Sequence, residues 1–121
     1  MYGFEMHRAT SVADATATLA RSGGKALAGG QSLVAAMKLR LAQPLHLVDL
    51  AAIPDLAGIR SEGSTLVIGA MTRHADVAAS AAVKATIPAL AALAEGIGDR
   101  QVRNMGTLGG SLANNDPAAD W

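Results

Sequence analysis

Polar and apolar residues at the start of the chain predict a short strand followed by a helix. Residues 4–9 alternate loosely between the two classes, which is typical of a strand. Ser11, with Asp14 three residues later, has the pattern of a helix N-terminal cap, and Gly23-Gly24 supplies a C-terminal stop. The residues expected on the apolar face of this helix are Val12, Ala15, Leu19 and Ala20.

A second strand and a second helix are predicted on either side of the glycine pair Gly29-Gly30. The apolar run 26–28 leads into the glycines, and residues 45–50 predict a further strand. Pro44 limits the helix that lies between these strands. Its expected apolar positions are Leu33, Met37 and Leu41.

The next part of the chain has the pattern of an antiparallel hairpin. Glu62-Gly63-Ser64 is a turn sequence, and it separates the strand-like segments 57–60 and 65–70. Because a hairpin brings its own local pairing, we expect a second sub-domain to begin at residue 57. The chain would then divide into two parts of similar size.

Two helices are predicted after the hairpin, followed by a loop. Thr72 is placed to cap a helix over 75–79, and Pro88 suits the first turn of another helix, which Gly96 would end. From Asp99 onward the chain is rich in Gly, Asn, Asp and Arg without periodicity, which predicts irregular structure. Polar loops of this kind often carry function.

Composition and charge exclude several classes of protein. The chain has 121 residues, half of them hydrophobic, with only one Trp, one Tyr and one Phe, so a single domain or part of one is expected, with an aliphatic core. Ten Lys and Arg residues balance ten Asp and Glu residues, which argues against nucleic acid as a partner. The absence of cysteine excludes disulfides, thiolate metal sites and a cysteine nucleophile on this chain.

The first ten residues do not resemble a signal peptide. They include Glu5, His7 and Arg8 where an apolar run would be needed, and no stretch of the chain is long and apolar enough to predict a membrane span. The sequence therefore predicts a cytoplasmic protein.

Two glycine-rich segments have the chemistry of an anion-binding site. In the first, AGGQS at 28–32, a predicted strand is followed by a predicted helix, so the backbone N–H groups from Gly30 to Leu33 are expected to face one point. The second, GTLGGS at 106–111, offers further N–H donors and two hydroxyl groups. Glycine suits a diphosphate because it has no Cβ to hold the anion away. Each segment alone also fits a tight turn without a ligand.

Neither segment matches the common nucleotide-binding fingerprints G-x-x-x-x-G-K-S/T and G-x-G-x-x-G. Instead, AGGQSLVAAMKLR at 28–40, VIGAMT at 67–72 and GDRQVRNMGTLGGSLANNDPAAD at 98–120 resemble, in matching order, the flavin subunit of the molybdenum hydroxylase family. That family includes xanthine dehydrogenases and carbon monoxide dehydrogenases. Its flavin subunits are considerably longer, so the resemblance identifies the chain as an N-terminal fragment of such a subunit.

The resemblance implies an α+β fold, namely the FAD-binding fold of the vanillyl-alcohol-oxidase and p-cresol-methylhydroxylase type. A first sub-domain would span 1–56, and an incomplete second sub-domain would span 57–121. The chain would bind FAD and would carry no catalytic or metal-ligating residue. The cofactor-binding residues that the resemblance implies are Leu27, Ala28, Gly29, Gly30, Gln31, Ser32, Leu33, Ile97, Gly98, Gly106, Thr107, Gly109, Gly110, Ser111, Asn115 and Asp120.

In such a subunit the two glycine segments would surround the diphosphate and the adjoining ribityl chain. Asp120, on a helix predicted to start at Asp116-Pro117, would lie near the ribityl hydroxyls. Electrons would come from a molybdenum cofactor and from 2Fe–2S clusters, both on partner subunits. They would leave from FAD to an external acceptor such as NAD or a quinone.

Other polar side chains have simpler interpretations. His7, His46 and His74 have no metal-ligand spacing and are predicted to be surface or hydrogen-bonding residues. Ser32 lies outside a G-x-S-x-G motif, so it fits a helix cap with a phosphate contact better than a nucleophile.

The basic residues near the glycine segments are expected to serve the protein surface. Arg100 and Arg103 flank the second segment, where ion pairs or a subunit interface are more common uses of arginine than a diphosphate contact. Lys38 and Arg40 predict a solvated or partner-facing stripe.

A second class of function stays open at this point. A non-catalytic module that binds a nucleotide or another anion, or an assembly subunit, would keep the same glycine segments without redox chemistry. Flavin absorbance of the purified protein would distinguish the two classes.

Overall fold

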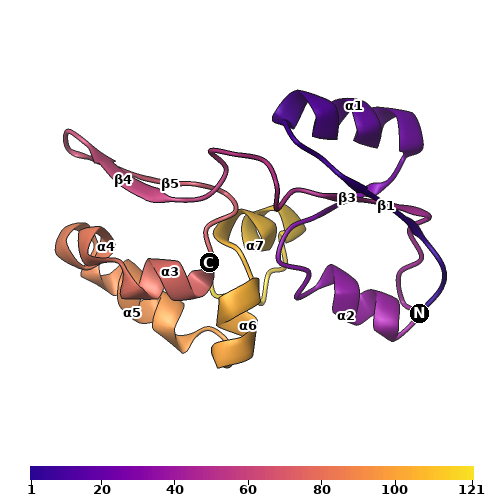
Figure 1. Cartoon of the computed structure of the whole chain (residues 1–121). Coiled ribbons are helices and arrows are strands. Elements are labelled where there is room, and N and C mark those ends of the chain that lie inside the picture. Colours follow the sequence, from indigo (N-terminus) through magenta and orange to yellow (C-terminus); the bar gives the residue numbers. More distant parts are fainter. The chain divides into compact units, whose positions relative to one another are not determined.

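The structure, a computed structural model, describes every residue from Met1 to Trp121. The chain divides into two compact units, Met1–Pro54 and Asp55–Trp121 (Figure 1). Each unit contains both helices and strands, and each is described by itself below.

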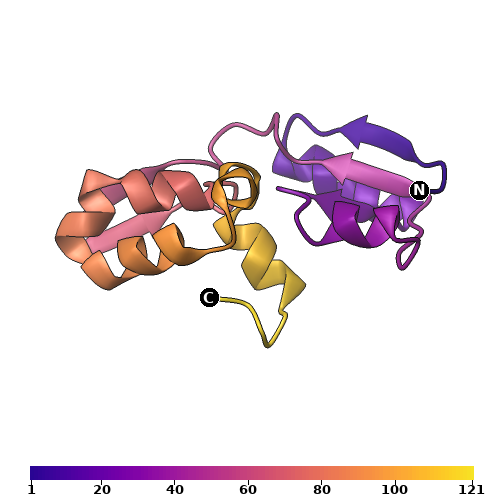
Figure 2. The same ribbon diagram turned by 90° about the horizontal axis from the view of Figure 1, so that it is seen from below.

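The first unit is a small parallel sheet covered by a helix on each face. The strands β1 (Glu5–Arg8), β2 (Lys25–Leu27) and β3 (His46–Asp49) pair in the order β1-β3-β2, with both pairings parallel. The helices α1 (Val12–Ser22) and α2 (Leu33–Lys38) lie on opposite faces of this sheet (Figures 1 and 2). The chain thus runs as two consecutive strand–helix units that end in the central strand.

The cap and the stop predicted for α1 are confirmed, but its buried face is not the one expected. The Ser11 hydroxyl accepts a hydrogen bond from the Asp14 backbone N–H at 3.0 Å, and Gly23 closes the helix with φ at +62°. Ala15 and Thr18 are the buried residues and Leu19 is partly buried, whereas Val12 is 53% exposed and Ala20 is exposed as well. The prediction gave Val12 too much weight, because a short three-stranded sheet covers only a narrow strip of the helix.

The helix α2 is shorter than its apolar pattern indicated. Met37 is buried in the core as a helical residue should be, but the helix ends at Lys38. Arg40 has a left-handed φ of +61°, and the N–H of Leu41 turns back to the Ala36 carbonyl at 2.8 Å. The expectation that Leu41 belongs to the apolar face of this helix is therefore wrong.

The core of the first unit is centred on β3. Leu47 and Val48 are almost fully buried on opposite faces of this strand, and Ala9 and Met37 are buried as well. Asp49 is buried too, and its carboxylate accepts a hydrogen bond from Arg8 Nε at 3.0 Å. Central position in the sheet explains why β3 is the most buried strand.

The second unit combines a hairpin with helices. The strands β4 (Ile59–Glu62) and β5 (Thr65–Ile68) pair antiparallel, which confirms the predicted hairpin. Three helices follow in sequence, namely α3 (His74–Ala79), α4 (Ala81–Thr86) and α5 (Pro88–Gly96). Their buried core consists of Val77, Val83, Ala91 and Ala94, against which Trp121 is partly buried.

Thr72 does not cap α3, contrary to prediction. The residue at the cap position is Arg73, whose side chain makes no capping hydrogen bond. The buried Thr72 hydroxyl instead donates to the Gly58 carbonyl at 3.1 Å and accepts from the Gly58 N–H at 3.0 Å. These two hydrogen bonds fix the residue before β4 to the chain segment that follows β5.

The segment after Asp99, predicted to be a loop, is mostly helical. It forms α6 (Arg100–Met105) and α7 (Leu108–Asn114), whose N-terminal caps are Asp99 and Thr107. The Asp99 carboxylate accepts from the Val102 N–H at 2.8 Å. Each helix is too short for a repeating apolar pattern, and local caps hold it instead.

The helix predicted at Asp116-Pro117 is absent. The Asp116 carboxylate accepts a hydrogen bond from the Ala118 N–H at 2.9 Å, so the chain forms a turn there. Across the whole chain, no helix has the length and apolar character needed to cross a membrane.

Candidate functional site

The first glycine segment, residues 28–33, leaves β2 and leads into α2 with its backbone donors free. None of the six N–H groups from Ala28 to Leu33 donates a hydrogen bond to another group of the chain. The segment is held by its carbonyls, since Gly30 O accepts from the Val34 N–H at 3.0 Å and Gly29 O accepts from Gln31 Nε2 at 3.1 Å. A continuous row of donors therefore remains available for a ligand.

Gly30 is the residue that gives this segment its shape. Its φ is +72°, a conformation that other residues adopt only with strain. A Cβ at this position would lie 2.9 Å from Val34 Cγ2 and 3.4 Å from Leu27 Cδ1. Gly29, by contrast, has no positive φ. The backbone requirement for glycine thus falls on the second glycine of the pair.

Ser32 occupies the N-terminal cap position of α2, but its hydroxyl makes no capping hydrogen bond. Ser32 and Gln31 are both exposed. The predicted cap is therefore absent at this residue, and its hydroxyl is free to contact a ligand.

The second glycine segment, residues 106–111, has most of its donors paired within the chain. Five of its six N–H groups donate hydrogen bonds, and only that of Thr107 does not. The bonds run from Leu108 to Thr72 O (3.0 Å), Gly109 to Ala70 O (2.8 Å), Gly106 to Val102 O (2.7 Å), Gly110 to Thr107 Oγ1 (3.1 Å) and Ser111 to Thr107 O (3.1 Å). The free backbone donors expected here from the sequence are reduced to one.

Glycine in the second segment serves close packing. A Cβ on Gly109 would lie 2.5 Å from Ala70 Cβ and 2.7 Å from Ala70 O. A Cβ on Gly106 would lie 2.7 Å from the imidazole of His74. Real Cβ atoms do not approach other protein atoms this closely. Packing within the chain therefore requires glycine at both positions, whether or not a ligand is bound.

His74 is buried beneath this segment, so the expectation of a surface or hydrogen-bonding histidine is wrong for it. Its Nδ1 has no hydrogen-bond partner, and its ring lies 5.0 Å from that of Trp121. Desolvation by burial lowers the pKa of His74, and the negative charge of Asp120 opposes part of that shift. The side chain is therefore neutral at physiological pH.

His7 is exposed and His46 is half-buried, and each lies close to a carboxylate. His7 Nε2 lies 3.1 Å from the Asp14 carboxylate, and His46 Nδ1 lies 3.5 Å from that of Glu5. The contact with His7 is the main reason why the pKa of Asp14 is lowered. No group of three or more His, Cys, Asp or Glu side chains is arranged to hold a metal ion.

The remaining candidate residues lie around α6 and α7. Ile97 is buried, Gly98 has a φ of +49°, and their carbonyls accept hydrogen bonds from Arg103 at 3.0 and 3.1 Å. Asn115 ends α7 in a left-handed conformation, and Asp120 is exposed. Arg103 thus stabilises the backbone before α6.

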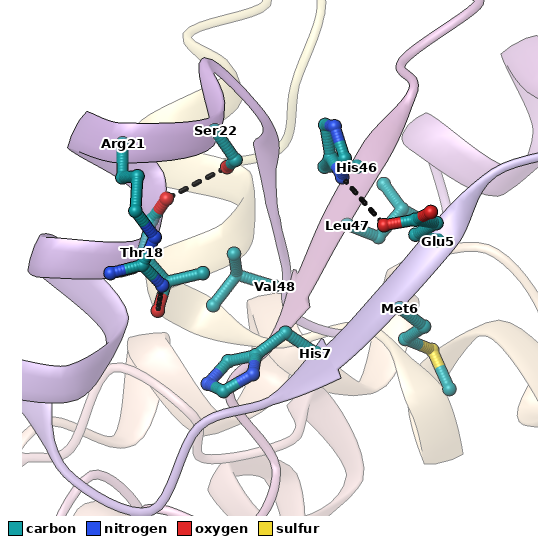
Figure 3. Close-up of a pocket in the computed structure, with 9 residues that line it drawn as sticks. All are labelled: Glu5, Met6, His7, Thr18, Arg21, Ser22, His46, Leu47 and Val48. Atoms are coloured by element: carbon teal, nitrogen blue, oxygen red, sulfur yellow. Dashed lines mark hydrogen bonds and ion pairs between the residues drawn. The ribbon is translucent and has the colours of Figure 1, made fainter.

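Two cavities that the sequence did not indicate lie in the first unit. One, of about 330 Å³, lies between α1 and the sheet (Figure 3). In this view Glu5 and His46 point toward each other, while Thr18 and Ser22 are joined by a hydrogen bond of 2.7 Å. The other, of about 470 Å³, is lined by Leu33 among other residues. Neither cavity is lined by the glycines of either segment.

Comparison with known proteins gives consistent matches along the whole chain. A family model described as the FAD binding domain in molybdopterin dehydrogenase matches residues 2–121. The carbon monoxide dehydrogenase medium chain of Hydrogenophaga pseudoflava is 53% identical over 119 residues, which is 97% of this chain and 42% of that relative. The corresponding chain of Afipia carboxidovorans is 50% identical over 97% of this chain and 41% of its own length.

Solved structures match equally well. A carbon monoxide dehydrogenase from Hydrogenophaga pseudoflava aligns with a TM-score of 0.94 at 53% identity, covering 96% of this chain and 41% of that one. Quinoline 2-oxidoreductase from Pseudomonas putida 86 aligns with a TM-score of 0.91 at 34% identity, with the same coverage. The predicted α+β fold of the FAD-binding type is confirmed. The chain spans about two fifths of the length of these relatives.

Proposed function

The chain belongs to the family of FAD-binding domains of molybdopterin dehydrogenases, and from this premise we propose that it is part of the flavoprotein subunit of a molybdenum hydroxylase. We assign to it the task of holding the FAD diphosphate. The two units would be two FAD sub-domains, each contributing one glycine segment. Two of the matched relatives are medium chains of carbon monoxide dehydrogenases, which are oxidoreductases.

The observation that carries this proposal is the row of free N–H groups in the first glycine segment. A diphosphate is a compact anion, and consecutive backbone donors can bind it without the entropy cost of ordering long basic side chains. The left-handed φ of Gly30 turns the backbone between Ala28 and Leu33, and such a turn would let successive N–H groups face one anion. The residues present therefore fit the cofactor that the family binds.

The second glycine segment is proposed to contribute fewer contacts of a different kind. Its candidates are the free N–H of Thr107 and the hydroxyl of Ser111. Gly106, Gly109 and Gly110 stay predicted cofactor contacts, although packing against His74 and Ala70 already requires glycine at the first two of these positions. Ile97, Gly98, Asn115 and the proposed ribityl contact of Asp120 stay predictions.

The redox role and the partners are proposals as well. When bound, FAD would accept electrons from iron–sulfur clusters and a molybdenum cofactor on partner subunits and pass them to NAD, a quinone or another external acceptor. The chain itself has no cysteine to ligate a cluster, so it would depend on a neighbouring subunit. Its residues would bind and orient the cofactor. A cytoplasmic location stays a prediction.

A pair of glycine substitutions in the full-length subunit tests the role of the first segment. Gly30→Ala and Gly63→Ala both place an alanine at a left-handed φ, +72° and +60°, so both carry similar backbone strain, and only Gly30→Ala also brings its Cβ within 2.9 Å of Val34 Cγ2. Gly30→Ala should weaken FAD binding by about tenfold or more, because N–H bonds to a charged group are lost. Gly63→Ala, in the hairpin turn, should bind FAD like the wild type.

The measurement is the titration of apo-protein with FAD, together with the flavin content of the protein as purified. If the Gly30→Ala subunit retained stoichiometric FAD with an unchanged dissociation constant, the first segment would not be the diphosphate site.

A further inference from the structure

The first unit exposes five large apolar side chains around the C-terminal end of α2. Leu39, Leu41 and Leu45 are 71%, 79% and 66% exposed, and Tyr2 and Phe4 are 43% and 39% exposed. Single exposed apolar residues are ordinary, but a group of this size in a unit of 54 residues indicates a surface that is covered in the working protein. We call these five residues the α2-end surface.

One backbone hydrogen bond and one side-chain contact connect parts of this surface. The Glu5 N–H donates to the Leu45 carbonyl at 2.8 Å, which places Phe4 beside Leu45. The Arg40 guanidinium lies 5.4 Å from the ring centre of Tyr2, which joins the start of the chain to the turn after α2. Both views of the ribbon show the N-terminus near the end of α2 (Figures 1 and 2).

The charged residues on either side of Leu39 are both basic. Lys38 and Arg40 flank Leu39 in the chain, and neither forms an ion pair with a carboxylate. The three carboxylates of residues 1–54, Glu5, Asp14 and Asp49, each face a basic side chain elsewhere, namely His46, His7 and Arg8. The α2-end surface is therefore apolar with uncompensated positive charge.

We propose that the α2-end surface binds a partner subunit of the oxidoreductase. The partner would contribute an apolar surface of its own, with carboxylates around its rim. This inference rests on the proposed function, in which the chain works inside a complex. An interface core of aromatic and aliphatic side chains with arginine nearby is the composition that protein interfaces favour. Opposite charge on the partner would complement Lys38 and Arg40 and would steer the association.

Two substitutions by glutamate, one on the α2-end surface and one away from it, test the proposal in the full-length complex. Leu41→Glu introduces a carboxylate on the α2-end surface. Val12→Glu introduces one on α1, which covers the opposite face of the sheet and whose Val12 is 53% exposed. Leu41→Glu should weaken the association of the flavoprotein with its partner subunits by about tenfold or more, whereas Val12→Glu should leave it unchanged. The association is measured by sedimentation or by titration of the purified subunits.

Flavin content separates this inference from the proposed function. A wild-type subunit without FAD would contradict the proposed function, whereas a Leu41→Glu subunit that keeps FAD and associates like the wild type would overturn only the surface. Hydrogen exchange of residues 38–45 in the isolated full-length subunit gives an independent result. Protection there that does not increase in the complex would mean that the subunit's own chain, or a second copy of it, covers the surface, and the proposal would be wrong.

A charge reversal keeps the test informative if Leu41→Glu fails to fold. Lys38 is exposed at the end of α2, so Lys38→Glu should fold normally. It should weaken association several-fold at low salt and much less at high salt, because screening removes the charge term. Association of Lys38→Glu that equals the wild type at low salt would contradict the predicted carboxylate rim.

Discussion

The two glycine segments look alike in sequence, yet the structure uses them in opposite ways. Each has two adjacent glycines close to a serine or threonine at the start of a helix. In residues 28–33 every backbone N–H is free, whereas in residues 106–111 only that of Thr107 is. The first segment therefore offers the donors of an anion site, and the second is a packed junction between chain segments.

The difference teaches that glycine has two separate physical uses that a sequence pattern does not distinguish. Gly30 is needed because the backbone takes a left-handed turn. Gly109 is needed because its Cα packs against Ala70, where a Cβ would be only 2.5 Å from a neighbouring carbon. Substitution in the first segment should affect ligand binding, and substitution in the second should affect folding.

The largest expected effect is on the stability of the second segment. Gly109→Ala should lower the free energy of unfolding by about 1–3 kcal/mol, because the new methyl group overpacks against the Ala70 backbone. Gly96→Ala is the matched control, since it is also helical and has nothing within 4 Å of its Cβ position. It should leave stability unchanged or raise it by up to about 1 kcal/mol.

Urea unfolding of the full-length subunit, followed by circular dichroism, measures both variants. Equal midpoints for Gly109→Ala and the wild type would mean that the second segment is not packed as described. The contrast between the two segments would then disappear.

A smaller effect is expected at the two cap positions. The Thr107 hydroxyl accepts from the Gly110 N–H at 3.1 Å, so Thr107→Ala should cost about 1 kcal/mol of stability. The Ser32 hydroxyl makes no such bond, so Ser32→Ala should change stability by less than about 0.5 kcal/mol. If Ser32 contacts the diphosphate, its variant should instead weaken FAD binding by about 0.5–1.5 kcal/mol.

The two measurements, unfolding midpoint and FAD dissociation constant, should therefore respond to different variants. A Ser32→Ala subunit that lost as much stability as Thr107→Ala would show that Ser32 also caps its helix. The conclusion that the Ser32 hydroxyl is available to a ligand while the Thr107 hydroxyl stabilises a helix would then be wrong.

Much of the fold could be predicted because strong local signals mark it. The cap of Ser11, the stop at Gly23 and the hairpin turn at Gly63 each depend on a few neighbouring residues, and the structure has all three. The helices α6 and α7 could not be predicted, because each is held by a single cap and by contacts with distant residues. Thr72 was misassigned for the same reason, since its partner, Gly58, lies 14 residues earlier.

For the candidate site, the sequence indicated both glycine segments. It did not indicate that the backbone N–H groups are free in the first segment and mostly paired in the second. Free and paired N–H groups depend on which carbonyls lie nearby, and the acceptors for Leu108 and Gly109 come from Thr72 and Ala70. The VIGAMT block that contains both acceptors was recognised only as part of the family resemblance. The buried position of His74 likewise follows from tertiary packing, with no local signal in the sequence.

The smallest effect is a pH dependence that should distinguish the second segment from the first. His74 packs against Gly106, and its burial lowers its pKa below the ordinary value near 6.5. The unfolded chain therefore takes up a proton at a higher pH than the folded chain does. The stability contributed by neutral His74 is fully present above the unfolded pKa, and it is lost as the pH falls toward the folded pKa.

Wild-type protein should accordingly unfold at a lower urea concentration at about pH 5.5 than at about pH 7.5, and His74→Phe should reduce this difference. Gly96→Ala is the control, because it changes no titratable group and its Cβ position is open. It should keep the wild-type dependence on pH. Since Asp120 opposes the pKa shift of His74, Asp120→Asn should enlarge the difference between the two pH values. An identical pH dependence in all four proteins would mean that the second segment does not depend on a neutral His74.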